Sequence, residues 1–170
     1  FTDIQNEKPE AVVFENSAVT SAVRIKATSS YHWEDDNNNK YMNIGDIDVF
    51  DPDGNSLIHP SSDTPVTPEP SESQWKVTGN SVSTNGGDGG GYEALIDGNI
   101  NTYYHSNYNE NGTGTTGLPV DLILDRGETA SSLPFQTFGY HPRNHTSINA
   151  NGNFKGIELY VSDDQNKLFE

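Results

Sequence analysis

The chain of 170 residues has the length of one ordinary domain with a linker, and it contains no Cys, which excludes disulfides, thiolate metal sites and cysteine nucleophiles. Nine basic residues against 25 acidic ones give a formal net charge of −16, which repels phosphate backbones and anionic lipid surfaces and argues against nucleic-acid binding. No apolar run approaches the ~18 residues of a membrane-spanning helix, so we expect no membrane insertion.

Short strands, rather than helices, are the elements that the sequence predicts. Alternating or apolar runs occur at residues 11–14, 23–27, 47–50, 120–124 and 157–161, and clusters of Gly, Asn, Asp and Ser separate them. Such runs are typical of an antiparallel sandwich or barrel. Because no window longer than about ten residues keeps the apolar spacing of an amphipathic helix, we expect an all-β fold with helix only as isolated turns.

Residues 51–74 differ from the rest of the chain. They hold five of the nine prolines and five acidic residues, with no basic residue. A segment of this composition cannot bury a core and favours extended, solvated chain, so it predicts a linker, with an ordered, Pro-rich edge loop as the alternative. The linker separates residues 1–50, too few for a stable sandwich, from residues 75–170, which lie within the size range of a domain.

The second block carries a series of short motifs in a fixed order. They are ALIDGNINTYYHS at 94–106, LP at 118–119, LDRG at 124–127, YHPR at 140–143 and IELYVSDD at 157–164. In combination these motifs resemble the discoidin, or coagulation-factor C-type, domain. The similarity is greatest to its bacterial carbohydrate-binding branch, the family 32 carbohydrate-binding modules.

The first block resembles the other end of the same fold. Residues 14–19 and 23–30 resemble its penultimate strand, and residues 43–50 resemble its last strand, although the family usually has Glu where this chain has Asp46. The resemblance therefore implies a jelly-roll β-sandwich, like that of galactose-binding domains, whose C-terminal strands precede its N-terminal part. We expect Trp75 and Tyr104 in its core.

Three explanations of the reversed order remain open. The chain is a circular permutant whose linker joins the old termini, or a fragment that spans two tandem modules, or a chain that exchanges strands with a neighbouring copy. In the first and third cases, we expect strands from residues 1–50 and 75–170 to pair within one sheet system.

The resemblance also implies one structural Ca²⁺ ion in the loop of residues 94–102. Calcium takes six to eight oxygen ligands from carboxylates, carbonyls and hydroxyls. The implied ligands are the carboxylates of Asp97 and Asp46, the hydroxyl of Thr102 and carbonyls near Ala94 and Asn99. The alternative is that Asp97-Gly98-Asn99 is simply an Asx turn.

A galactose-type sugar site is the second implication of the resemblance. Its residues would be His105, Tyr108, Arg143, Asn151 and Trp33. An aromatic ring stacks on the apolar face of a pyranose, while Arg, His and Asn bind its hydroxyls.

Two of these assignments have competitors. Asn149 competes with Asn151, and the loop that contains Trp33 also contains Tyr31, His32 and Tyr41. It also remains open that His105 and Arg143 are structural hydrogen-bonding residues and that the aromatic residues only fill loops.

Catalytic motifs are absent from the sequence. It has neither H-E-x-x-H nor G-x-S-x-G, so we expect no enzyme activity in this segment. The resemblance implies a non-catalytic module that holds a secreted or cell-surface bacterial enzyme or adhesin on glycans carrying galactose or N-acetylgalactosamine, with a catalytic domain elsewhere in the parent polypeptide. The alternative is a protein-interaction or cell-adhesion module of the same fold.

Overall fold

The computed structural model describes residues 10–31, 41–59, 75–84, 89–107, 118–127, 132–143 and 152–169. Its strands in chain order are β1 Glu10–Thr20, β2 Ala22–Ser30, β3 Asn43–Phe50, β4 Lys76–Gly79, β5 Tyr104–His105, β6 Val120–Asp125, β7 Leu133–Pro142 and β8 Phe154–Ser162. Two 3-10 turns, η1 Glu93–Leu95 and η2 Gln165–Lys167, are the helices of this part of the chain. No helix found there is long and apolar enough to cross a membrane.

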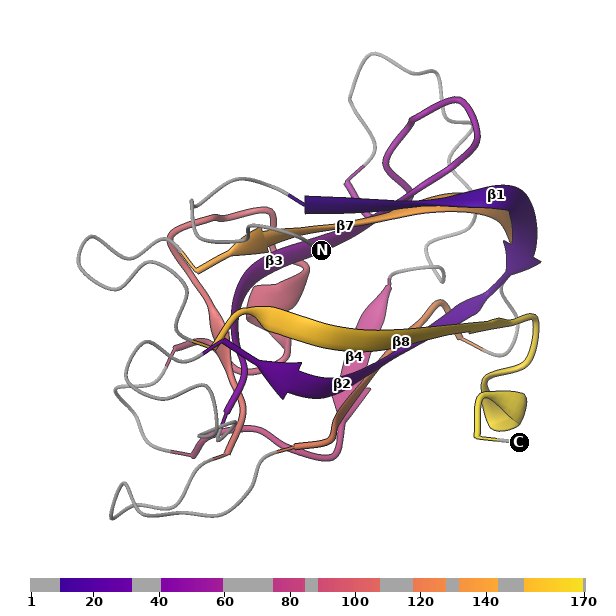
Figure 1. Ribbon diagram of the computed structural model, residues 1–170. Helices are drawn as coiled ribbons and strands as arrows, with labels where there is room; N and C mark the ends of the chain where they lie inside the picture. Colours follow the sequence, from indigo (N-terminus) through magenta and orange to yellow (C-terminus); the bar gives the residue numbers. More distant parts are fainter. Residues whose placement is uncertain are drawn as a thin grey trace.

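The strands form two four-stranded antiparallel sheets with the orders β1-β7-β3-β5 and β4-β6-β2-β8. Figure 1 shows them as two layers, one with β1, β7 and β3 and the other with β8, β2 and β4. The prediction of an all-β sandwich is confirmed.

Strands from the first block occupy an interior place in each sheet. In one sheet β2 lies between β6 and β8, so that Ile25 is paired with both Leu122 and Leu159. In the other, β3 lies between β7 and β5. Strands from residues 10–50 and 75–169 therefore pair within one sheet system, as the sequence predicts for a single folded unit.

The core follows from the alternation that the sequence displays. Alternate residues of β2 and β6 are buried, while the residues between them face outward. The core side chains that the two blocks contribute include Val23, Ile25, Ile47, Val49, Leu122, Leu124, Phe138 and Tyr140. Trp75 and Tyr104 are also buried, which confirms their predicted place in the core.

The first part of the predicted linker has a defined structure. Residues 51–55 form a hydrogen-bonded turn, after which the Leu57 amide donates to the Val49 carbonyl at 2.8 Å. The Trp75 indole donates to the Leu57 carbonyl at 2.7 Å, and Leu57 and Ile58 pack against the core. Residues 51–59 thus fold back over β3 instead of leading straight away from it. Residues 60–74 lie outside the described residues.

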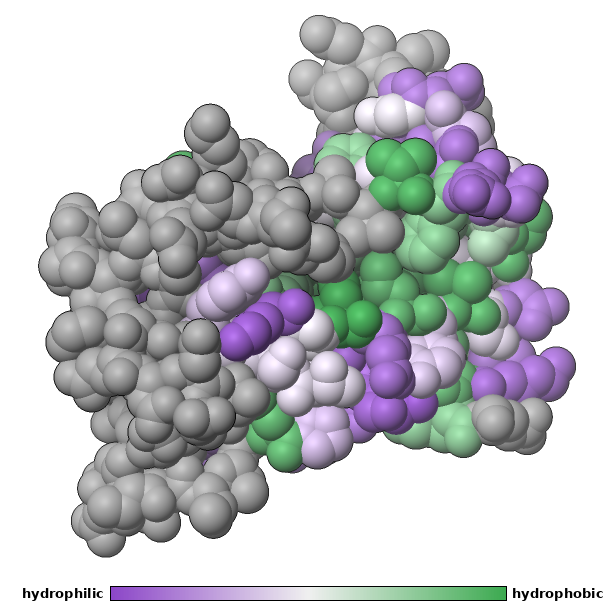
Figure 2. Space-filling model, in the orientation of Figure 1, coloured by the Kyte–Doolittle hydropathy of each residue, from purple (hydrophilic) through white to green (hydrophobic). Residues whose placement is uncertain are grey.

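β1 and β8 are edge strands of the two sheets, and both carry exposed apolar side chains. Figure 2 shows apolar residues in the band between β1 and β8. Val13 and Val19 of β1 and Tyr160 and Val161 of β8 are among the exposed large apolar side chains.

We predict that Ile25→Ala lowers the free energy of unfolding by about 2–5 kcal/mol, because it opens a cavity between strands of both blocks. Urea denaturation followed by fluorescence and by circular dichroism measures the effect. Both probes should report one shared transition, because the residues of a single core unfold cooperatively. Val13→Ala, at a side chain that is 66% exposed, is the control and should change stability little. Two separate transitions would contradict the shared core.

Candidate functional site

Two of the predicted sugar-binding residues come together at one end of the first sheet. The register pairs Asn43 with His105 on β5 and Ile44 with Pro142 on β7. Arg143 follows Pro142 directly. His105 and Arg143 therefore flank the beginning of β3 from its two neighbouring strands.

Local contacts hold His105 in one orientation. Only 7% of the residue is exposed, and its Nδ1 atom lies 2.7 Å from the Ser106 carbonyl oxygen. Because a carbonyl only accepts, Nδ1 carries a proton and donates it, so that in the neutral ring Nε2 is an acceptor. The ring of Tyr41 packs on the imidazole, with 4.8 Å between the ring centroids.

An aromatic ring also positions Arg143. The guanidinium carbon lies 3.7 Å from the centroid of the Tyr103 ring, which is a cation–π contact. Both residues are half-buried. Stacking fixes the plane of the guanidinium while its edge keeps the N–H groups that bind hydroxyl oxygens.

The other predicted sugar-binding residues, Trp33, Tyr108 and Asn151, lie outside the described residues, as do the competing Asn149 and His32. Of the two aromatic residues before β3 that the structure describes, Tyr31 and Tyr41, it is Tyr41 whose ring packs on His105.

The backbone beside Asn151 is tied to the same end of the sheet. Gly152 accepts from the Asn43 amide at 2.8 Å and donates to the Tyr31 carbonyl at 2.8 Å. Its φ of 85° suits glycine, and a Cβ atom there would lie 2.4 Å from the Asn43 Cβ atom. A glycine is therefore required where this loop meets β3.

The predicted cation loop folds as a tight polar turn. Asp97 Oδ1 accepts from the Asn99 amide at 2.8 Å, and the Thr102 hydroxyl lies 2.7 Å from both Asp97 Oδ2 and the Asn99 carbonyl oxygen. Three of the predicted ligands thus meet in one turn. These hydrogen bonds are also those of an Asx turn. Ala94, in η1 at the start of the loop, is buried.

Asp46 lies beside this loop with a histidine that the sequence analysis did not identify. The residue is buried, and its Oδ1 atom accepts from the Ile47 amide at 2.9 Å. The His59 Nε2 atom lies 3.8 Å from Asp46 Oδ2, and the His59 ring covers Gly98. His59 comes from the segment predicted as linker, where nothing in the sequence indicated a site.

Burial raises the pKa of Asp46 to about 6, because the site is poor in solvent. The charges of Asp97 and Asp48 act in the same direction, while the positive charge of a protonated His59 opposes them. A positive charge placed beside Asp46 would therefore stabilise its ionised carboxylate.

The described part of the chain holds no metal-binding set made of acidic, histidine or cysteine side chains alone. No three His, Cys, Asp or Glu side chains of the described residues form a group that could hold a metal ion. A cation at this loop would depend on carbonyl oxygens and on Thr102 as much as on Asp46 and Asp97. That oxygen-rich donor set suits Ca²⁺ rather than a transition metal.

Comparison of the chain with models of protein families and with curated protein sequences finds no match.

We predict that, in the chain freed of divalent cations, the contribution of Asp46 to stability falls as the pH rises from about 4 to 6. The folded state raises the pKa of Asp46, so it holds this proton more tightly than the unfolded state does. The stability contributed by the proton is full below pH 3.8 and is lost as the pH rises through about 6.

Urea denaturation in a chelator at a series of pH values measures this slope. Asp46→Asn should flatten it, whereas Asp53→Asn, at an exposed turn, should not. Equal slopes in the wild-type protein and in Asp46→Asn would contradict the assignment.

Proposed function

We propose that the chain is a non-catalytic carbohydrate-binding module with the jelly-roll topology of the discoidin family. It recognises galactose or N-acetylgalactosamine on glycans and holds a secreted or cell-surface enzyme or adhesin on them. The observation that carries the proposal is the convergence of His105 and Arg143 at one end of a sheet, each beside an aromatic ring. The sequence resemblance assigns these two residues to a sugar site.

The chemistry of this arrangement suits a neutral sugar. A fixed imidazole and a fixed guanidinium bind hydroxyl groups in defined directions, one as an acceptor and the other as a donor, and such a rigid pair loses little entropy when a ligand binds. Tyr41 and Tyr103 are aromatic faces next to these groups, of the kind that stacks on a pyranose ring. In this proposal Tyr108, Asn151 and Trp33 complete the site.

We further propose that the loop of residues 94–102 holds one structural Ca²⁺ ion. Asp97, Thr102 and the carbonyls of Ala94 and Asn99 would bind it, and the buried Asp46 would complete the shell. The ion would supply the positive charge that offsets Asp46 and Asp97. It would thereby hold the loop that leads into Tyr103 and His105.

The order of the two blocks supports a permuted module. Because β2 and β3 are interior strands, the chain can complete its own sandwich. Strand exchange between neighbouring copies would use the same strand pairs.

A second candidate function is that of a protein-interaction or cell-adhesion module. The observation in its favour is the group of exposed apolar side chains on β1 and β8, in the region seen in Figure 2. A glycan array separates the two functions, because a protein-interaction module binds none of the glycans.

We predict that Arg143→Ala weakens binding of galactose-terminated glycans at least about tenfold, since a charged hydrogen-bond donor to the sugar is lost. Isothermal titration calorimetry measures the effect, starting from a micromolar to millimolar dissociation constant. Lys167→Ala removes an exposed positive charge on η2 and is the matched control. An unchanged affinity in Arg143→Ala, or an equal loss of affinity in Lys167→Ala, would refute the proposed sugar site.

Calcium should raise the melting temperature and a chelator should lower it, because an ion that binds only the folded state stabilises that state. Differential scanning calorimetry with each additive tests this expectation. Asp97→Ala should abolish the difference, and Asp53→Ala, which removes another exposed carboxylate, should keep it. A melting temperature that responds to neither calcium nor chelator would exclude the ion.

A further inference from the structure

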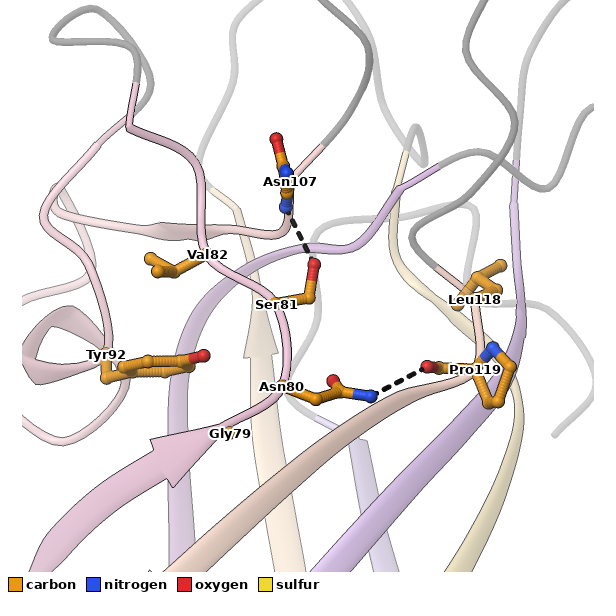
Figure 3. A pocket seen from close by; sticks show the side chains of 8 residues that line it. All are labelled: Gly79, Asn80, Ser81, Val82, Tyr92, Asn107, Leu118 and Pro119. Carbon is orange, nitrogen blue, oxygen red and sulfur yellow. Dashed lines mark hydrogen bonds between the residues drawn. The ribbon is translucent and has the colours of Figure 1, made fainter.

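A groove of about 570 Å³ opens where β4 ends and β6 begins. Among the residues that line it are Asn80, Ser81, Tyr92, Asn107, Leu118 and Pro119. Figure 3 shows Tyr92 on one side, Leu118 and Pro119 on the opposite side, and Asn80 and Ser81 between them. We call this feature the polar groove.

We propose that the polar groove is a second carbohydrate subsite that binds a neutral sugar ring of a longer glycan. This inference rests on the proposed function, because it assumes that the terminal sugar of the same glycan is held near His105 and Arg143. Neither the sequence motifs nor the resemblance assigns a ligand to the groove.

The floor of the polar groove is held in place before any ligand binds. The Asn80 side chain donates to the Pro119 carbonyl at 3.3 Å and accepts from the Asp121 amide at 3.0 Å. The Asn107 amide donates to Ser81 Oγ at 2.9 Å, and the Tyr104 hydroxyl donates to the Ser81 carbonyl. A preorganised floor reduces the entropy that binding would otherwise cost.

Close packing beneath the groove requires a glycine. A Cβ atom on Gly79 would lie 2.5 Å from the Asp121 carbonyl oxygen and 3.0 Å from the Tyr92 ring. The Tyr92 ring can therefore approach the backbone at the end of β4, and it forms a firm side of the groove.

The chemistry of the lining selects a neutral ligand rich in hydroxyl groups. The chain has 25 acidic and nine basic residues, yet none of the described residues that line the groove is charged. Amides and hydroxyls, which both donate and accept, match the hydroxyls of a sugar. Val82 and Leu118 add apolar surface for its C–H groups. The volume lies within the ~300–1,000 Å³ typical of small-molecule sites.

The position of the groove suits an extension of the primary site. Asn107 lies two residues beyond His105, so their Cα atoms are at most about 7 Å apart. The segment before η1 runs beside this stretch, where the Ser83 amide donates to the His105 carbonyl at 2.8 Å. A glycan of two or more rings can therefore contact both sites.

The Asn107 side chain is the contact best suited to mutation. The residue is exposed, and its fold-related hydrogen bond, donated to Ser81, uses the backbone amide rather than the side chain. Asn107→Ala therefore removes a ligand contact and leaves this bond of the groove in place. Tyr92→Phe is a second variant, which removes one hydroxyl and keeps the ring.

The experiment compares galactose with lactose on the full ¹⁵N-labelled chain by NMR titration. Lactose should shift the amide signals of Ser81 and Asn107 as well as that of His105, and it should bind about five- to tenfold more tightly than galactose. Asn107→Ala and Tyr92→Phe should each lower this lactose-to-galactose ratio toward one. Asn166→Ala, which removes an exposed amide on η2, should leave the ratio unchanged.

Equal affinities for the two sugars, or a ratio that neither groove variant changes, would overturn the subsite while the primary site stands. If neither sugar shifts His105 or Arg143, the proposed function fails. In that case, a titration to about 100 mM lactose tests whether the groove binds the sugar by itself, because this concentration detects millimolar binding. Shifts at Ser81 and Asn107 would support it, and their absence would overturn it.

Discussion

The interior strands β2 and β3 join the two blocks of the chain into one fold. Each of these strands hydrogen-bonds to neighbours from the second block on both of its edges, so neither sheet is continuous without the first 50 residues. The buried faces of Val23 and Ile25 pack in one core with Leu122, Leu124 and Phe138. Burial of this apolar surface, rather than the order of segments along the chain, determines the fold.

The same strand arrangement assembles both candidate sites. The beginning of β3 separates His105 from Arg143, so the first block sets the spacing of two side chains that belong to the second. Three residues further along, Asp46 faces the loop that contains Asp97, while His59 covers Gly98. The proposed sugar site and the proposed cation loop thus both lie at β3, where a shift in register would disturb both.

The parts of the fold that could be predicted are those in which a local pattern decides the structure. Strict alternation identifies β2 and β6, whereas β7 is not identified, because its burial does not alternate: Phe138, Gly139 and Tyr140 are buried in succession. The sequence motif predicts that Asp97, Asn99 and Thr102 lie in one loop. The hydrogen bonds of this loop are local, which is why the motif is sufficient to predict it. His59 and the contact of Tyr41 with His105 depend on how loops fold back, which composition does not encode.

Native-state hydrogen exchange shows whether both blocks form one cooperative sandwich. If β2 and β3 are interior strands, their slowest amides should exchange only through global unfolding, with the same opening free energy as the slowest amides of β6 and β7. The free energy from urea denaturation supplies the reference value. Exchange of β2 and β3 through an opening of clearly lower free energy, while β6 and β7 stay protected, would contradict the account.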